Sequence, residues 1–109
     1  MGEGKVTNIN SKDEWTSVHQ KAGDKAVIVD FSATWCGPCR MISPYFEELS
    51  TKYSGVTFVK VDVDAVEAVA QECGISAMPT FQVWKNNQKV DELVGASKDK
   101  LQALVKKYA

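Results

Sequence analysis

Two cysteines separated by two residues, Cys36 and Cys39, are the side chains of this sequence best suited to covalent chemistry. Residues three apart on a helix are neighbours, and that separation suits disulfide geometry. Closing so short a loop stabilises a fold by only about 2 kcal/mol, against roughly 4.7 for a loop of a hundred residues. The pair is therefore better suited to a bond that opens and closes than to one that holds a fold together.

The segments on either side place the pair where a strand ends and a helix begins. Residues 25–31 (KAVIVDF) form an apolar, β-branched run that is typical of a buried strand. After the pair, apolar residues recur at helical spacing: Met41, Ile42, Tyr45, Phe46 and Leu49. The first N–H groups of a helix lack internal partners and the helix dipole is positive there. We therefore expect the pKa of Cys36 to lie below the value of about 8.5 for a free cysteine.

The dipeptide between the two sulfurs also fits a reactive pair. Pro38 suits the first turn of a helix, where its missing N–H is not needed, and it stiffens the segment. Gly37 has no side chain that could block the approach of another protein to Cys36.

Two other uses of this cysteine spacing remain open at this point, a structural disulfide and half of a zinc site. Cys73 and His19 could complete a Cys₃His set with the pair, although two distant helices would have to supply them. Cys73 falls on the apolar side of a predicted helix, and free cysteines are commonly buried. We therefore expect Cys73 to be buried, the alternative being a regulatory or dimer-forming thiol. His19 is expected to pack or to form a hydrogen bond, and we expect no metal.

Composition limits the classes of protein to consider. A length of 109 residues predicts one domain, residues 1–109. A net charge of −1 gives no sign of binding to nucleic acid or to an anionic membrane. The chain has no long apolar segment, and residues 1–5 lack a signal-peptide core. Val6 stands where a myristoylation signal would need Ser or Thr. With only three cysteines and one close pair, the sequence predicts a protein of the reducing cytoplasm. A monomer is also expected.

The rest of the chain supplies further strands and helices in the order βαβαβαββα. Strands are predicted near residues 7–9, 56–62, 80–84 and 89–94, and helices near 12–22, 65–73 and 98–108. Helix caps are expected at Ser11, Asp64 and Ser97, and a tight turn at Asn86 and Asn87. This order predicts an α/β protein with a mixed sheet and helices on both faces.

Four motifs, in this order and at these spacings, closely resemble those of the thioredoxin family. They are the active-site stretch at 29–40 (VDFSATWCGPCR), the lysine of 59–62 (VKVD), the cis-proline loop at 77–81 (AMPTF) and the glycine loop at 94–96 (VGA). The resemblance covers nearly the whole chain and implies the thioredoxin fold, a central mixed five-stranded sheet flanked by four helices. Glutaredoxins and protein disulfide isomerase domains usually carry a different dipeptide between the cysteines, so Gly37 and Pro38 argue against both families. Ser32 stands where bacterial thioredoxins often have an aromatic residue, so the eukaryotic cytosolic type is closer.

The resemblance also implies roles for individual residues. Cys36 is the expected nucleophile and Cys39 the resolving thiol. Asp30, an acid inside an apolar strand, is the expected proton acceptor behind Cys39, with its pKa raised by burial. The alternative is that Asp30 lies on an edge strand of the sheet and faces water. Lys60 matches the lysine near the buried aspartate of the family, and it either pairs with Asp30 or is solvated.

A second group of residues is expected to bind the substrate. A cis bond before Pro79 would turn the backbone of Met78 toward the cysteines, where an extended peptide could pair with it. Gly95 would line the same groove, and Trp35 would form an apolar wall beside it. The other two tryptophans, Trp15 and Trp84, are expected to pack in the interior.

The function implied is general reduction of protein disulfides, which maintains cell redox homeostasis. The expected partners are disulfide-containing target proteins and a thioredoxin reductase that draws on NADPH. The sequence leaves a ferredoxin-linked reductase open as the alternative electron donor. The chain has no glycine-rich nucleotide loop, so it is not expected to bind NADPH or another cofactor itself. The alternative function is a binding module that holds its partners according to redox state.

Overall fold

Five strands and four helices follow one another in the computed structural model, which describes residues 5–109, and they confirm the predicted order. They are β1 (Val6–Ile9), α1 (Lys12–Ala22), β2 (Val27–Ser32), α2 (Gly37–Lys52), β3 (Thr57–Asp62), α3 (Glu67–Glu72), β4 (Thr80–Lys85), β5 (Gln88–Val94) and α4 (Lys98–Tyr108). The expectations about a signal peptide and a myristoylation signal fall mainly on residues 1–4, which lie outside the described residues. Within residues 5–109, no helix is long and apolar enough to span a membrane.

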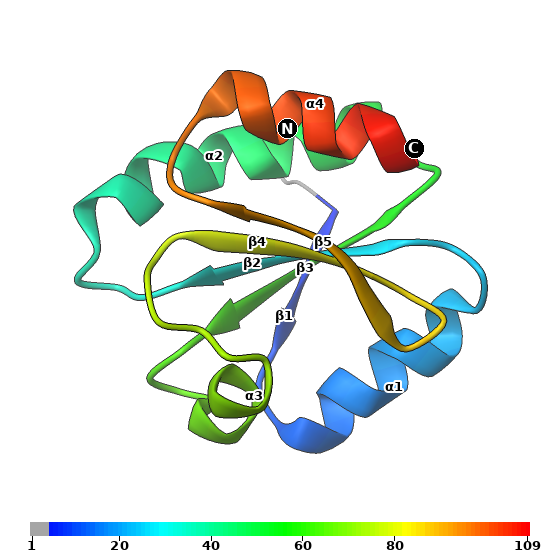
Figure 1. Cartoon of the computed structure of the whole chain (residues 1–109), viewed down its shortest axis with the longest axis horizontal. Helices are drawn as coiled ribbons and strands as arrows, with labels where there is room; N and C mark the ends of the chain where they lie inside the picture. Colours follow the sequence, from blue (N-terminus) through cyan, green and yellow to red (C-terminus); the bar gives the residue numbers. More distant parts are fainter. Residues whose placement is uncertain (1–4) are drawn as a thin grey trace.

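The sheet is mixed, with strand order β1-β3-β2-β4-β5. The pairs β1–β3 and β3–β2 are parallel, whereas β2–β4 and β4–β5 are antiparallel. Helices α2 and α4 cover one face of the sheet, and α1 and α3 lie on the other (Figure 1). The predicted five-stranded mixed sheet with helices on both faces is therefore confirmed, and β2 is its central strand.

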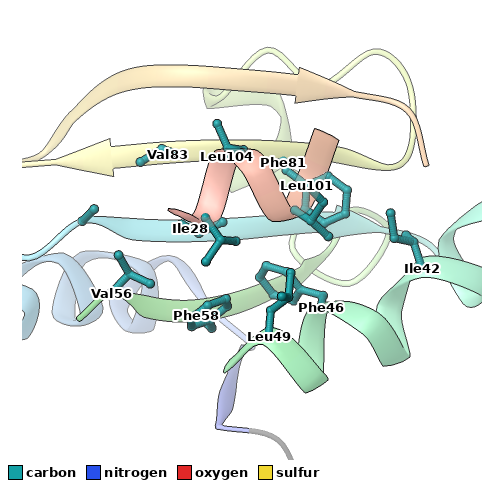
Figure 2. Close-up of a cluster of buried hydrophobic side chains, with 12 residues drawn as sticks. Ile28, Ile42, Phe46, Leu49, Val56, Phe58, Phe81, Val83, Leu101 and Leu104 are labelled. Carbon is teal, nitrogen blue, oxygen red and sulfur yellow. The ribbon is translucent and has the colours of Figure 1, made fainter. Parts of the chain in front are cut away.

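Because β2 is central, both of its faces are buried, which explains its almost continuous apolar sequence. Successive side chains of a strand point to opposite faces. Val27, Val29 and Phe31 therefore join the core beneath α1 and α3. Ile28 points the other way, into a core that α2 and α4 share with the sheet (Figure 2). By the same alternation, Asp30 faces α2.

The core on the α2 and α4 face is built from buried aliphatic and aromatic side chains of both helices and of the strands β2, β3 and β4. Phe46 of α2 lies at its centre, with ring centroids 5.2 Å from Phe58 and 5.5 Å from Phe81. Figure 2 labels ten of its members: Ile28, Ile42, Phe46, Leu49, Val56, Phe58, Phe81, Val83, Leu101 and Leu104. This packing fixes α2, and with it the cysteine pair, against the end of β2.

Most of the predicted turns and caps are confirmed. The Ser11 hydroxyl accepts the Glu14 N–H, and the Ser97 hydroxyl accepts the Lys100 N–H. Asn86 and Asn87 have φ values of 52° and 66°, as the hairpin turn between β4 and β5 requires.

The cap predicted at Asp64 is wrong. Helix α3 begins after Val66, with no side-chain cap. The Asp62 carboxylate instead accepts the N–H groups of Asp64 and Ala65, at 2.9 and 3.3 Å, and holds the turn that precedes the helix. Asp64 is thereby left free to contact Trp35, as described below.

His19 lies between two tryptophans in the core beneath α1. Its ring centroid is 4.3 Å from that of Trp15 and 5.6 Å from that of Trp84. Its Nε2 is buried and has no hydrogen-bond partner among the described residues. Burial lowers the pKa of His19, because a positive charge in this cluster would lose its hydration. The expected packing roles of His19, Trp15 and Trp84 agree with this arrangement.

The lowered pKa predicts how His19 affects stability. The unfolded chain binds a proton at His19 more readily than the folded chain does, so stability falls as the pH drops below about 6.5. Replacing His19 with phenylalanine should remove this loss. In urea unfolding from about pH 7.5 to about pH 5, the free-energy difference between H19F and the unmodified protein should grow in favour of H19F. A difference that stays constant across this range would contradict the prediction.

Candidate active site

The structure holds Cys36 and Cys39 as a disulfide at the junction of β2 and α2, with their Cα atoms 5.3 Å apart. Cys36 is the N-cap residue of α2, and Pro38 lies in the first turn. The Cys36 Sγ accepts the Cys39 N–H at 3.2 Å. In the reduced protein, the same N–H and the positive end of the helix would favour a thiolate at Cys36.

The disulfide is nearly buried, whereas the residues next to it in the chain are exposed. Cys36 and Cys39 are only 6% and 2% exposed, whereas the neighbouring Trp35 is 65% exposed. The Trp35 indole N–H donates to the Asp64 carboxylate at 2.8 Å. Gly37 is exposed, with open space where a side chain would stand. The site therefore presents an apolar ring, held by one hydrogen bond, beside an almost buried sulfur pair.

The loop before β4 also approaches the disulfide, next to Cys36. The Met78–Pro79 peptide bond is cis, and the Met78 carbonyl oxygen lies 3.9 Å from the Cys36 Sγ. The Gly95 N–H donates to the Pro79 carbonyl at 2.9 Å. Gly95 has a φ of 114°, which favours glycine, and a side chain there would point into open space. Thus Met78 lies beside Cys36, and Gly95 is joined to the same loop through Pro79.

Asp30 lies on the α2 side of the central strand and is fully buried. Its Oδ2 accepts a hydrogen bond from the Ser43 hydroxyl at 3.2 Å, and its Oδ1 is buried without a partner among the described residues. Burial raises the pKa of Asp30 to about 6, an effect that Lys60 and Ser43 reduce and that Glu47 reinforces. The edge position considered from the sequence is wrong, because β2 is flanked by β3 and β4.

Lys60 lies opposite Asp30 in the parallel register of β2 and β3. It is half-buried, and the ion pairs among the described residues do not include one with Asp30. Its charge nevertheless opposes the rise in the pKa of Asp30. Lys60 is therefore neither a direct partner of Asp30 nor a fully solvated lysine, and it acts on the carboxylate over a longer distance.

A cavity of about 550 Å³ opens at the carboxyl ends of β1, β2 and β3, next to the start of α2. Cys39, Ser43, Glu47, Lys60 and Asp62 are among the residues that line it. Neither Cys36 nor the residues beside it on the Met78 side belong to the lining. The two cysteines therefore have different surroundings, with the cavity on the Cys39 side and the cis-proline loop on the Cys36 side.

The sequence analysis missed Ser43, which is the cavity-lining residue that contacts Asp30 directly. One signal was present, because Ser43 is four residues after Cys39 and so lies on the same side of α2. Nothing in the sequence alone shows that this side of the helix faces Asp30, since strand and helix meet only in the folded chain.

The structure does not assemble the zinc set considered from the sequence. Cys73 and His19 lie beneath α1 and α3, away from the cluster that contains Cys36 and Cys39. Among the described residues, there is no group of three or more His, Cys, Asp or Glu side chains that could hold a metal ion.

Cys73 is a buried free cysteine, and burial, with a contribution from Glu72, raises the pKa of its thiol to about 11. We predict slow labelling of Cys73 by iodoacetamide at neutral pH, since the reactive thiolate is scarce and shielded. The disulfide form isolates this measurement, because Cys73 is then the one free thiol of the three cysteines. Unfolding in urea should accelerate the labelling, whereas fast labelling of the folded protein would indicate a regulatory thiol.

Comparison with known proteins agrees with this geometry. The family model described as Thioredoxin matches residues 6–107. A Thioredoxin H-type from Chlamydomonas reinhardtii is 58% identical over 109 residues, which cover 97% of this chain and 96% of that protein. Thioredoxin NaTrxh from Nicotiana alata is 41% identical and superposes with a TM-score of 0.93, covering 99% of this chain and 96% of that one. A chain of the solved complex of ferredoxin:thioredoxin reductase and thioredoxin f2 superposes with a TM-score of 0.88, at 36% identity and with 98% and 97% of the chains covered.

A redox-active cysteine pair at the N-terminus of a helix, on a mixed sheet of this topology, defines a dithiol–disulfide oxidoreductase. Within that class, the chain belongs to the thioredoxin family. It is a protein-disulfide reductase that works through the Cys36–Cys39 pair, with the general role of that family in cell redox homeostasis. The resemblance, the fold and the activity expected from the sequence are thereby confirmed.

Proposed function

We propose that Cys36 is the nucleophile and Cys39 the resolving thiol, in a domain that spans residues 1–109. The observation that carries this assignment is the place of Cys36 as N-cap residue of α2, with its Sγ accepting the Cys39 N–H. That hydrogen bond and the helix dipole stabilise negative charge on Cys36 and not on Cys39. Gly37 and Pro38 keep the segment between the sulfurs short, exposed and stiff.

The reaction proceeds in two exchanges. The Cys36 thiolate attacks one sulfur of a target disulfide, forms a mixed disulfide and releases the other target sulfur as a thiolate. Cys39 loses its proton and attacks the Cys36 sulfur, which releases the second target sulfur and leaves the Cys36–Cys39 disulfide. The target gains two electrons and this protein loses two.

Asp30 accepts the Cys39 proton in the second exchange, directly or through a water molecule. Its raised pKa supports this role, because a base that titrates near neutral pH can both take up and release a proton. Lys60 moderates that pKa from the neighbouring strand. The cavity lined by Cys39 and Lys60 leaves room for solvent beside the thiol that loses the proton.

Target proteins bind across the Cys36 side of the site. The Met78 carbonyl, next to the cis bond to Pro79, can pair with an extended segment of the target in the manner of an added strand. Trp35 supplies an exposed apolar surface, and Gly95 leaves the opposite side of the groove open.

We propose that the protein works as a monomer in the cytoplasm.

The electron donor we propose is a thioredoxin reductase that draws on NADPH, with no cofactor held by this chain. The solved complex of thioredoxin f2 with ferredoxin:thioredoxin reductase makes a ferredoxin-linked donor the second candidate. Insulin reduction separates them, with NADPH and a purified NADPH-dependent reductase in one assay and reduced ferredoxin with its reductase in the other. Sustained turnover in the first assay supports the proposal, and turnover in the second assay alone would overturn it.

A further inference from the structure

The hydroxyl of Ser43 is the one side-chain group of the described residues that donates a hydrogen bond to the buried Asp30. Ser43 also lines the cavity beside Cys39, whereas Asp30 does not. The serine therefore stands between the cavity and the Asp30 carboxylate. Its place one helical turn after Cys39 puts the thiol and the hydroxyl on the same side of α2.

We propose that Ser43 is a positioning residue, whose hydroxyl orients the Asp30 carboxylate and favours the charged form that accepts the Cys39 proton. This inference deepens the proposed function and rests on the base role given there to Asp30.

The direction of the effect follows from hydrogen-bond chemistry. An ionised carboxylate only accepts hydrogen bonds, so the Ser43 hydroxyl must donate to it. A hydrogen bond to a charged group is stronger than one between neutral partners, so the contact stabilises the carboxylate more than the carboxylic acid. Because Oδ1 of Asp30 has no partner among the described residues, the bond from Ser43 to Oδ2 is the hydrogen bond that stabilises the charged form, in addition to the charge of Lys60.

Other charges that face Asp30 come from the elements packed around it. Lys60 on β3 favours the charged form and Glu47 on α2 disfavours it. Phe81, the residue opposite on β4, carries no charge. Cys39 on α2 titrates only in the reduced protein, so the disulfide form shows the effect of Ser43 without overlap from the active-site thiols.

The test is Ser43→Ala, with Ser43→Thr as the variant that restores a hydroxyl. In the disulfide form, the Asp30 carboxyl is titrated by carbon NMR of its side chain. We expect its pKa to rise by about one pH unit in S43A, as loss of one hydrogen bond to a charged group predicts, and to return toward the original value in S43T. Thr51→Ala is the matched control, since the Thr51 hydroxyl is exposed on the same helix and bonds only to the Glu48 carbonyl.

A second measurement links this shift to the reaction. The decay of a preformed mixed disulfide on Cys36 is followed across pH, and its acid limb should move upward in S43A by the same amount as the carboxyl pKa. In an Asp30→Asn background, Ser43→Ala should have no further effect on this profile. An effect of equal size with and without Asp30 would show that Ser43 acts through general packing, and it would overturn the proposal.

An unchanged Asp30 pKa in S43A would also overturn the inference about Ser43, whatever the kinetics. A raised pKa with an unmoved acid limb in S43A would instead leave Ser43 as the residue that stabilises the carboxylate, and it would count against Asp30 as the base. The two proposals therefore fail on different measurements.

Discussion

Replacing Cys36 with serine is expected to reduce insulin reduction to the uncatalysed background, while the fold stays intact. A serine hydroxyl does not ionise near neutral pH, so it cannot replace the attacking thiolate. Cys39 cannot replace Cys36 either, because it does not lie at the N-cap of α2. The side chain of Cys36 is almost fully buried, and serine is slightly smaller than cysteine, so the packing around it changes little. Circular dichroism and urea unfolding should confirm that the loss is chemical.

Replacing Cys39 with serine should give a different result. The first exchange still occurs, but the mixed disulfide with the target is not resolved and accumulates on Cys36. Non-reducing gels of C39S incubated with an oxidised target should show this adduct, and reduction by dithiothreitol should release it. If C36S forms the adduct and C39S does not, the roles of the two sulfurs are reversed.

Replacing Asp30 with asparagine has the second largest expected effect, and it acts on both rate and stability. Asparagine keeps the shape of the side chain but cannot take the Cys39 proton, so the second exchange should slow while the first stays almost unchanged. We expect a loss of up to about 100-fold, which is the lower end of what a general base contributes. The loss should be largest above about pH 6, where Asp30 is charged, and below the range in which an ordinary thiol ionises without a base.

The same variant should be more stable than the unmodified protein at neutral pH. The pKa of Asp30 is raised from 3.8 to about 6, so the folded chain binds a proton that the unfolded chain has released. Stability from this group is therefore highest below about pH 4 and is lost as the pH rises through about 6. A shift of this size corresponds to about 3 kcal/mol above pH 7, which asparagine should largely recover.

Urea unfolding across pH and single-turnover reduction, each with both proteins, check the two effects separately. The stability gain should be small at about pH 4 and full at about pH 8. A gain that does not vary with pH would show that the Asp30 carboxylate is not the destabilising group. Equal rates of resolution at every pH would remove Asp30 from the reaction but leave its effect on stability.

The elements that carry the site were predictable because their signals are local. The apolar run of β2 and the helical periodicity after the cysteines place the pair at a strand–helix junction without any tertiary information. Capping by Ser11 and Ser97 and the turn at Asn86 and Asn87 depend equally on short-range chemistry. The motif at 77–81 added the cis bond at Pro79, which spacing alone does not predict.

The interactions that the sequence analysis missed join residues from different elements. The contact of Ser43 with Asp30 depends on how α2 lies on the sheet. Asp64 was expected to cap α3, but its carboxylate binds the Trp35 indole, 29 residues away in sequence. A side chain of this type suits a cap and a long-range acceptor equally well, and only the backbone path through the turn at Asp62 decides between them.

The separation of the cavity from the cis-proline loop has a consequence for the order of events during catalysis. In the binding mode proposed above, a target on the Trp35 and Met78 side would cover Cys36, whereas the cavity beside Cys39 is lined by neither Trp35 nor Met78. Water would then reach Cys39 through the cavity while the two proteins are still joined by the mixed disulfide. On these proposals, the proton of Cys39 and the target protein would reach the site from different sides, so the target need not leave before the proton is transferred to solvent.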